Sequence, residues 1–166
     1  MRMFSLACAL AVASISAGAA QTSTTTTKKA PAAKAAPSAA ARTIQLTGDD
    51  KMKYDVTELT AKPGETLKIV LKNVGTMPKM AMAHNFVLLK AGTDQVEFTK
   101  AAFNARDTDF IPAAMKDAVI AHTGLAGPGE TVEITFKVPA NAGTYAFLCS
   151  FPGHFALGMK GSLVVK

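Results

Sequence analysis

Apolar and polar residues alternate along several short stretches of the chain, beginning at about residue 43. Side chains two positions apart share one face of a strand, so this alternation is typical of strands with one buried face. Residues 67–72 illustrate it, because Leu67, Ile69 and Leu71 fall on the same face. The other alternating strands are predicted at residues 56–60, 131–138, 144–149 and 161–165.

The run at residues 86–89 is continuously apolar, which is typical of a strand buried on both sides. Turns containing Gly or Pro separate the strands, at residues 61–65, 127–129 and 141–143. Short strands between such turns predict an all-β fold, as an antiparallel sandwich or a barrel. Residues 93–116 differ, because their apolar spacing favours helix, and they are predicted to form a small helical insertion outside the sandwich.

The first 20 residues have the features of an export signal. Arg2 supplies a positive charge, residues 6–15 are apolar and uncharged, and the small residues 17–20 offer a cleavage site. The apolar run is shorter than the roughly 20 residues that a membrane span needs, although an uncleaved N-terminal anchor stays open as an alternative. Residues 1–20 are therefore predicted to be a signal peptide, which implies a periplasmic protein.

The next segment, residues 21–42, is rich in Thr, Ala, Lys and Pro and contains no aromatic residue. Such a composition buries too little apolar surface to offset the entropy of the chain, so it predicts a disordered spacer. Residues 43–166 remain as a single domain, which is large enough to form a substantial core.

Five of the six units of formal net positive charge lie in the N-terminal part of the chain. The first 42 residues contain five Lys and Arg and no acidic residue, whereas residues 43–166 contain 13 basic and 12 acidic residues. A nucleic-acid interface needs basic residues clustered on the domain itself, so no nucleic-acid partner is predicted. Loose association of the basic spacer with an anionic membrane surface is an alternative to the preferred interpretation, a solvated spacer.

The candidate chemistry lies near the C-terminus, where Cys149 is the single cysteine left once a signal peptide carrying Cys8 is removed. A single cysteine cannot form an internal disulfide, and a free thiol is a liability in an oxidising compartment unless it has a ligand. His154 follows five residues later, and Met159 follows after five more. A thiolate, an imidazole and a thioether on one loop form a ligand set that suits copper.

A second imidazole would complete this site, and the only other histidines are His84 and His122. Both lie beside predicted strands, so the residues alone leave the choice open. Two histidines and one thiolate in a trigonal set, with a weak axial methionine, form the arrangement of blue-copper electron-transfer sites. Neither oxidation state of copper has its preferred geometry there, so little has to move when an electron arrives or leaves.

Three segments resemble the azurins and auracyanins of the cupredoxin family: Met82-Ala83-His84-Asn85, Val119-Ile120-Ala121-His122-Thr123 and residues 149–161. The resemblance implies an eight-stranded Greek-key β-sandwich that holds one type 1 copper ion near one end. It implies these roles by position: His84, Cys149 and His154 as equatorial ligands, Met159 as the axial ligand, the Ala83 backbone carbonyl as a weak axial contact, Asn85 as a brace between the ligand loops, and His122 as a surface residue that is not a ligand.

Two features depart from azurin. Met159 lies five residues after His154 because of an additional residue, Gly158, whereas the azurin spacing is four. This longer spacing resembles auracyanin and plastocyanin, and it bears on the axial bond. Azurin also has a disulfide far from the copper, and this chain has no cysteines to form it. The core must therefore supply the few kcal/mol that such a crosslink contributes.

Apolar and neutral residues flank His154, and in the family the corresponding patch is where redox partners dock. The residues predicted to form the patch are Met77, Pro78, Pro152, Phe155, Ala156 and Leu157. The outer edge of the His154 imidazole is expected to emerge through them. Weak docking suits fast turnover, and the net charge of +1 on the domain predicts a small dependence on salt. A monomer is expected.

The predicted function is that of a periplasmic blue-copper electron carrier with one copper per chain. Three histidines are too few for the second copper centre of a copper oxidase or nitrite reductase, and no hydrolase motif is present, so no enzymatic activity is predicted. The alternative is a periplasmic copper carrier or storage protein. Met77, Met80 and Met82 favour it mildly, although methionine is a common core residue.

Overall fold

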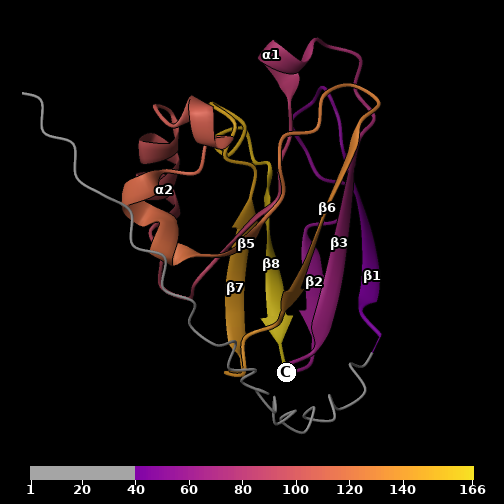
Figure 1. Ribbon diagram of the computed structural model, residues 1–166, viewed down its shortest axis with the longest axis vertical. Helices are drawn as coiled ribbons and strands as arrows, with labels where there is room; N and C mark the ends of the chain where they lie inside the picture. The colour runs from indigo at the N-terminus through magenta and orange to yellow at the C-terminus, as the bar shows by residue number, and fades with distance from the viewer. Residues whose placement is uncertain (1–39) are drawn as a thin grey trace, which may run out of the picture. The chain divides into compact units, whose positions relative to one another are not determined.

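Two β-sheets face each other in the computed structural model, which describes residues 40–166 (Figure 1). One sheet has three strands, in the order β1 (Arg42–Gly48), β3 (Thr66–Asn73) and β6 (Thr131–Lys137). The other has five, in the order β2 (Glu58–Ala61), β8 (Lys160–Val165), β7 (Gly143–Leu148), β4 (Val87–Leu89) and β5 (Val119–His122). The predicted all-β Greek-key sandwich of eight strands is confirmed. The predicted signal peptide and residues 21–39 of the spacer lie outside the described residues, so that division stays a prediction.

The direction of the strands corrects one expectation. β3 and β6, β7 and β8, and β4 with both of its neighbours are antiparallel, but β1 pairs with β3 and β2 with β8 in parallel. The expectation of a purely antiparallel sandwich is wrong for these two pairs. Alternation in a strand reports which face is buried and carries no information about the direction of its neighbour.

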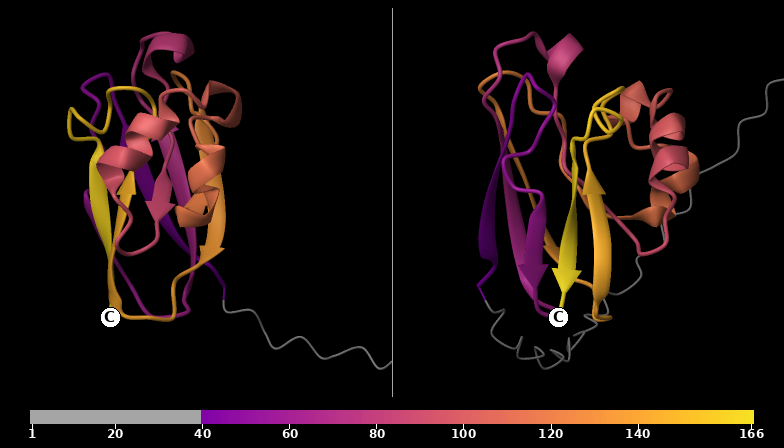
Figure 2. Two further views of the ribbon diagram at one scale, coloured as in Figure 1. Left: turned by 90° about the vertical axis from the view of Figure 1, so that its left-hand side faces the viewer. Right: turned by 180° about the vertical axis from the view of Figure 1, so that it is seen from behind.

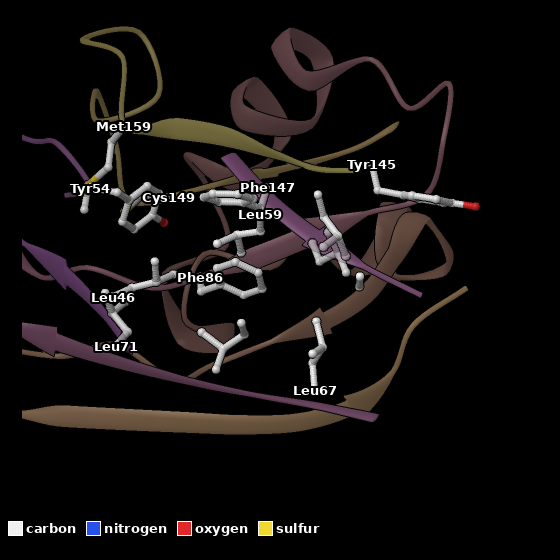
Figure 3. Close-up of a cluster of buried hydrophobic side chains, with 14 of the residues drawn as sticks. Leu46, Tyr54, Leu59, Leu67, Leu71, Phe86, Tyr145, Phe147, Cys149 and Met159 are labelled. Atoms are coloured by element: carbon white, nitrogen blue, oxygen red, sulfur yellow. The ribbon is translucent and has the colours of Figure 1, made fainter. Parts of the chain in front are cut away.

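The main core lies between the two sheets (Figure 3). In β3, Leu67, Ile69 and Leu71 are fully buried, as their alternation predicts. They face aromatic side chains from the other sheet, where the rings of Phe86 and Phe147 lie 5.1 Å apart. Each such apolar side chain contributes about 1.5–3 kcal/mol when it is fully buried.

A second, smaller core lies on the outer face of the five-stranded sheet, where the helical insertion covers it (Figure 2). Helix α2 (Gln95–Ala102) begins at Asp94, whose carboxylate accepts hydrogen bonds from the backbone amides of Val96 and Glu97. Its buried Phe98 contributes to a cluster with Val87 and Leu89 of β4. β4 is therefore buried on both faces, as its continuous apolar sequence predicts.

Two short 3₁₀ helices complete the insertion, η1 (Arg106–Thr108) and η2 (Ala113–Ala118). A further single-turn helix, α1 (Lys79–Met82), lies in the connection between β3 and β4 and has no counterpart among the predicted elements. The Asp50 carboxylate anchors the start of this connection, because it accepts hydrogen bonds from the amide and hydroxyl of Thr76. Within residues 40–166, no helix has the length and apolar character that crossing a membrane requires.

Candidate metal centre

Three potential ligands meet at one end of the sandwich. His84 lies three residues before β4, Cys149 directly follows β7, and His154 lies on the loop between β7 and β8. The Nδ1 atoms of His84 and His154 are 3.2 Å apart, and the Sγ of Cys149 is 3.5 Å from the Nδ1 of His154. One ligand atom from each residue lies within 4.8 Å of the others, and all three residues are buried. Segments that are 65 residues apart in sequence thus form one compact donor set.

The loop that carries Cys149, His154 and Met159 is held by its own backbone hydrogen bonds. The amide of Cys149 donates to the carbonyl of Met159 at 3.0 Å, and the amide of Met159 donates to the carbonyl of His154 at 2.9 Å. Gly158 has a φ of +95°, in the left-handed region that favours glycine. The additional residue in the spacing is therefore accommodated by a conformation that most other residues adopt only with strain.

Met159 is fully buried. Its thioether and the imidazole ring of His84 both lie against Gly48, the last residue of β1. A Cβ atom on Gly48 would lie 2.8 Å from the Cε of Met159 and 2.9 Å from the Cδ2 of His84. The absence of a side chain at Gly48 therefore lets the thioether and the imidazole ring converge. The role of Gly48 was not predicted, because the sequence does not show which side chains pack against a glycine at the end of a strand.

The backbone of His84 is fixed on both sides. It forms a pair of hydrogen bonds with Ala126, with N–O distances of 3.0 and 2.8 Å. The amide group of the buried Asn73 donates to the carbonyls of Met82 and Ala126, both at 3.0 Å. Asn73 was also missed by sequence analysis, because its partners lie 9 and 53 residues away.

Asn85 connects the segment of His84 to that of Cys149. Its Nδ2 donates to the hydroxyl of Ser150 at 2.8 Å and to the carbonyl of Asp109 at 2.9 Å, while its Oδ1 accepts from the amide of Ser150 at 2.9 Å. This is the geometry that a brace between ligand loops requires. That Asn85 thereby influences a bound metal stays a prediction.

A buried tyrosine, Tyr54, supports the same brace and had no signal in the sequence. Its hydroxyl donates to the backbone carbonyl of Asn85 at 2.5 Å, and its ring lies 5.5 Å from that of Phe147. Burial raises the pKa of the phenol well above its usual value, and the nearby Cys149 raises it further. Tyr54 therefore remains a neutral hydrogen-bond donor beside the cluster (Figure 3).

The protonation states of the cluster follow from its burial. Burial lowers the pKa of His154 to about 4, with the neighbouring His84 as a smaller cause, so its imidazole is neutral near pH 7. The pKa of His84 is also lowered by burial, and the backbone of Asp49 opposes this effect. Burial raises the pKa of the Cys149 thiol to about 12, against the smaller effects of the Asn85 and Phe151 backbones. Neutral imidazoles are the form that binds a metal, whereas the thiol has to lose a proton.

The donor set fits a soft metal ion. Two neutral imidazoles, a thiol and a nearby thioether suit copper, whereas magnesium and calcium prefer oxygen ligands. The Nε2 of His84 is fully buried, and no atom of residues 40–166 meets hydrogen-bond geometry with it. Buried polar atoms are normally paired. The cluster is therefore polar, enclosed and incompletely satisfied by the described part of the chain, as expected of residues that together hold an ion.

Other predicted residues lie around the cluster. Pro78 and Ala156 are exposed, as are Met77 (42%) and Leu157 (54%), while Pro152 and Phe155 are half-buried. His122 is exposed and lies outside the cluster, and its assignment as a histidine that does not bind the metal stays a prediction.

The position of His154 differs from the expectation. Its side chain was predicted to reach solvent through the patch, but the residue is only 2% exposed. The ring of Phe151 lies 4.7 Å away and helps to cover it. Tertiary packing of this kind leaves no mark on the local sequence.

A two-sheet sandwich with a buried His-Cys-His cluster and a methionine at one end defines the class of the cupredoxins, in which the site holds a single copper ion. Residues 41–166 match the family model described as copper-binding proteins of the plastocyanin/azurin family. The chain belongs to this family.

Among its relatives, auracyanin-A from Chloroflexus aurantiacus is 38% identical over 127 residues, which cover 75% of this chain and 74% of the relative. Azurin-2 from Alcaligenes xylosoxydans xylosoxydans is 41% identical over 121 residues, which cover 71% and 92%. The solved structure of dithionite-reduced auracyanin from Roseiflexus castenholzii matches with a TM-score of 0.67 at 38% identity, over 77% of this chain and 99% of that one. These matches confirm the predicted family and the copper cofactor at a single type 1 site.

Replacing Gly48 with alanine should disturb the site without preventing folding. The added methyl group would press on Met159 and His84, and overpacking of this kind costs about 1–3 kcal/mol. We expect a lower unfolding temperature and a changed visible spectrum of the copper-loaded protein. Gly124→Ala is the control, because its Cβ would meet only the Asp109 carboxylate at 3.5 Å. Equal, small effects of both substitutions would contradict the role assigned to Gly48.

Proposed function

We propose that the protein is a blue-copper electron carrier that cycles between Cu(II) and Cu(I) at one mononuclear type 1 site. His84, Cys149 and His154 would hold the copper ion, with the Met159 thioether and the Ala83 carbonyl as weaker donors. The observation that carries this proposal is the converging, buried set of two imidazole Nδ1 atoms and one thiol sulfur within 4.8 Å. Bound copper supplies the one-electron redox chemistry, because it is stable in both oxidation states.

The contribution of the chain is to hold the ligands still. The hydrogen bonds within the loop fix Cys149 relative to Met159, and Asn85 ties this loop to the segment of His84. Burial excludes water, so an electron can be gained or lost with little rearrangement of solvent. A ligand set that suits neither oxidation state fully, held by such a network, favours fast electron transfer.

The setting of this function follows from the sequence. The predicted signal peptide supports export to the periplasm, and the patch around His154 supports brief docking of redox partner proteins. We propose a monomer without enzymatic activity, with loose membrane-surface association through the basic N-terminal segment as a further option. The relatives named above are azurins and auracyanins, which supports an electron carrier.

A copper carrier or storage protein is the second candidate, and the exposure of two methionines favours it. Met80 is 79% exposed and Met77 is 42% exposed, so neither serves mainly as core. Thioethers bind Cu(I) well. The buried, closed cluster argues against this function, because a metal that is handed over needs an accessible site.

Repeated redox cycling separates the two functions. The full chain, loaded with one Cu(II), is reduced with ascorbate and reoxidised in the presence of a membrane-impermeant Cu(I) chelator such as bathocuproine disulfonate. We expect the visible absorption to return over several cycles, with little copper lost to the chelator. Transfer of most of the Cu(I) within one cycle would contradict an electron carrier and favour the copper carrier. The double substitution Met77→Leu and Met80→Leu should leave cycling unchanged.

A further inference from the structure

An exposed aromatic residue, Phe103, lies where the helical insertion meets the ligand loop. Helix α2 turns Phe98 and Ala102 towards the sheet, so the next residue, Phe103, projects outwards and is 64% exposed. Burying such a ring is favourable, and an exposed aromatic residue among other exposed apolar side chains marks an interaction surface. Val74, Met77, Met80 and Leu157 are the other large exposed apolar residues in the connections at the copper end.

Two grooves flank Phe103. The first, of about 330 Å³, lies between the end of α2 and the ligand loop and is lined by residues that include Lys100 and Phe155. The second, of about 400 Å³, extends towards α1 and η1 and is lined by residues that include Lys79 and Arg106. Phe103, Phe151 and Pro152 line both grooves. Phe103 therefore forms a ridge between two depressions on one continuous surface.

The linings of the two grooves contain basic side chains but no acidic ones. The basic residues are Lys79, Lys100 and Arg106. Lys79 and Lys100 form exposed ion pairs with Glu130 and Glu97, which lie outside the lining. Arg106 forms no ion pair within residues 40–166, so its guanidinium is available to a carboxylate on another molecule.

The grooves are also close to the copper ligands. Phe151 lines both, and its ring lies 4.7 Å from that of His154. A partner seated in either groove therefore contacts Phe151, whose ring packs against the almost fully covered imidazole of His154. Short paths of this kind through packed atoms suit electron transfer.

We propose that the electron-transfer partner docks over Phe103 and is a redox protein whose docking face is apolar at its centre and acidic at its rim. This inference rests on the proposed electron-carrier function. Arg106 attracts the carboxylates, Phe103 enters an apolar depression, and the electron passes by way of Phe151. One electron leaves the reduced copper site and reduces the oxidised cofactor of the partner, with no transfer of a proton. Charges at a rim raise the rate of encounter without making the complex long-lived, as an electron carrier requires.

Mitochondrial cytochrome c is a suitable probe, in its basic native form and with its lysines succinylated so that it becomes acidic. The second-order rate of electron exchange is measured with the copper-loaded full chain at low and high salt. Arg106→Glu should slow exchange with the succinylated form about three- to tenfold at low salt and speed exchange with the native form. Because the N-terminal segment is basic, the readout is the difference between variants measured against the same cytochrome.

Lys137→Glu is the matched control. This residue is exposed, forms no ion pair within residues 40–166 and ends β6, opposite Thr66 and away from the copper end. The same charge reversal there should change either rate less than about twofold. Phe103→Ala should slow exchange with the succinylated form about fivefold even at high salt, whereas Phe103→Leu should retain most of the rate.

Equal responses to Arg106→Glu and Lys137→Glu, or unchanged rates for Phe103→Ala, would overturn the docking surface. Exchange with both cytochromes at rates that no variant alters would leave the electron-carrier function intact and remove only this inference. If the copper-loaded chain exchanged electrons with none of the three reagents, the two cytochromes and ferricyanide, the proposed function itself would be wrong. The visible spectrum of each variant checks that the copper site is unchanged.

Discussion

Replacing Cys149 with serine should abolish the intense visible absorption of the copper-loaded protein and lower its copper affinity more than about 100-fold. The absorption of a type 1 site arises from charge transfer between a thiolate and Cu(II), and a serine hydroxyl cannot supply it. Loss of a residue that only supports a ligand already costs about 10- to 100-fold in affinity, so loss of the ligand itself costs more. Absorption spectroscopy and competition with a chelator of known affinity measure the two effects.

His122→Asn is the control for this experiment, because His122 is exposed and lies outside the cluster. We expect it to retain both the absorption and the affinity. His84→Ala and His154→Ala should each weaken binding, and the spectrum should change in both, because each removes one imidazole of the cluster. A strongly coloured Cys149→Ser protein would show that the thiolate is not a ligand, and the proposed type 1 site would then be wrong.

Much of the fold could be predicted, because its determinants are local. The alternation in β3 and β6 reports one buried face, and the continuous apolar sequence of β4 reports two. The helical insertion follows from a change in apolar spacing, and Asp94 provides its N-cap. The candidate ligands on the β7–β8 loop also follow from spacing, since Cys149, His154 and Met159 lie within eleven residues.

The remaining features depend on contacts between distant segments. The parallel pairing of β1 with β3 follows from the path of the chain, since either direction buries the same side chains. Tyr54 reaches Asn85 across 31 residues, and Asn73 reaches Ala126 across 53. Gly48 matters because of what approaches it, and the cover over His154 comes from the ring of Phe151. Such contacts have no periodicity, so no sequence pattern reports them.

The affinity for copper should rise about tenfold for each pH unit between about pH 7 and pH 9. In the copper-free protein the Cys149 thiol has a pKa raised to about 12, so it holds its proton throughout this range and releases it when copper binds. The pKa of His154 is lowered to about 4, so its imidazole is already neutral and adds no further proton. One proton released per copper gives this slope, and binding is favoured as the pH rises.

Competition with a chelator whose own pH dependence is known measures the slope, and calorimetry in buffers of different ionisation enthalpy counts the protons released. In Cys149→Ser the slope should fall almost to zero over the same range, because a serine hydroxyl holds its proton and the imidazoles are neutral. His122→Asn should keep the full slope. A slope of two protons would mean that one imidazole is charged near pH 7 despite its burial, and a slope near zero in the unchanged chain would mean that Cys149 does not bind the metal as a thiolate. Because these outcomes differ in the number of protons, the experiment tests the ligand and its protonation state together.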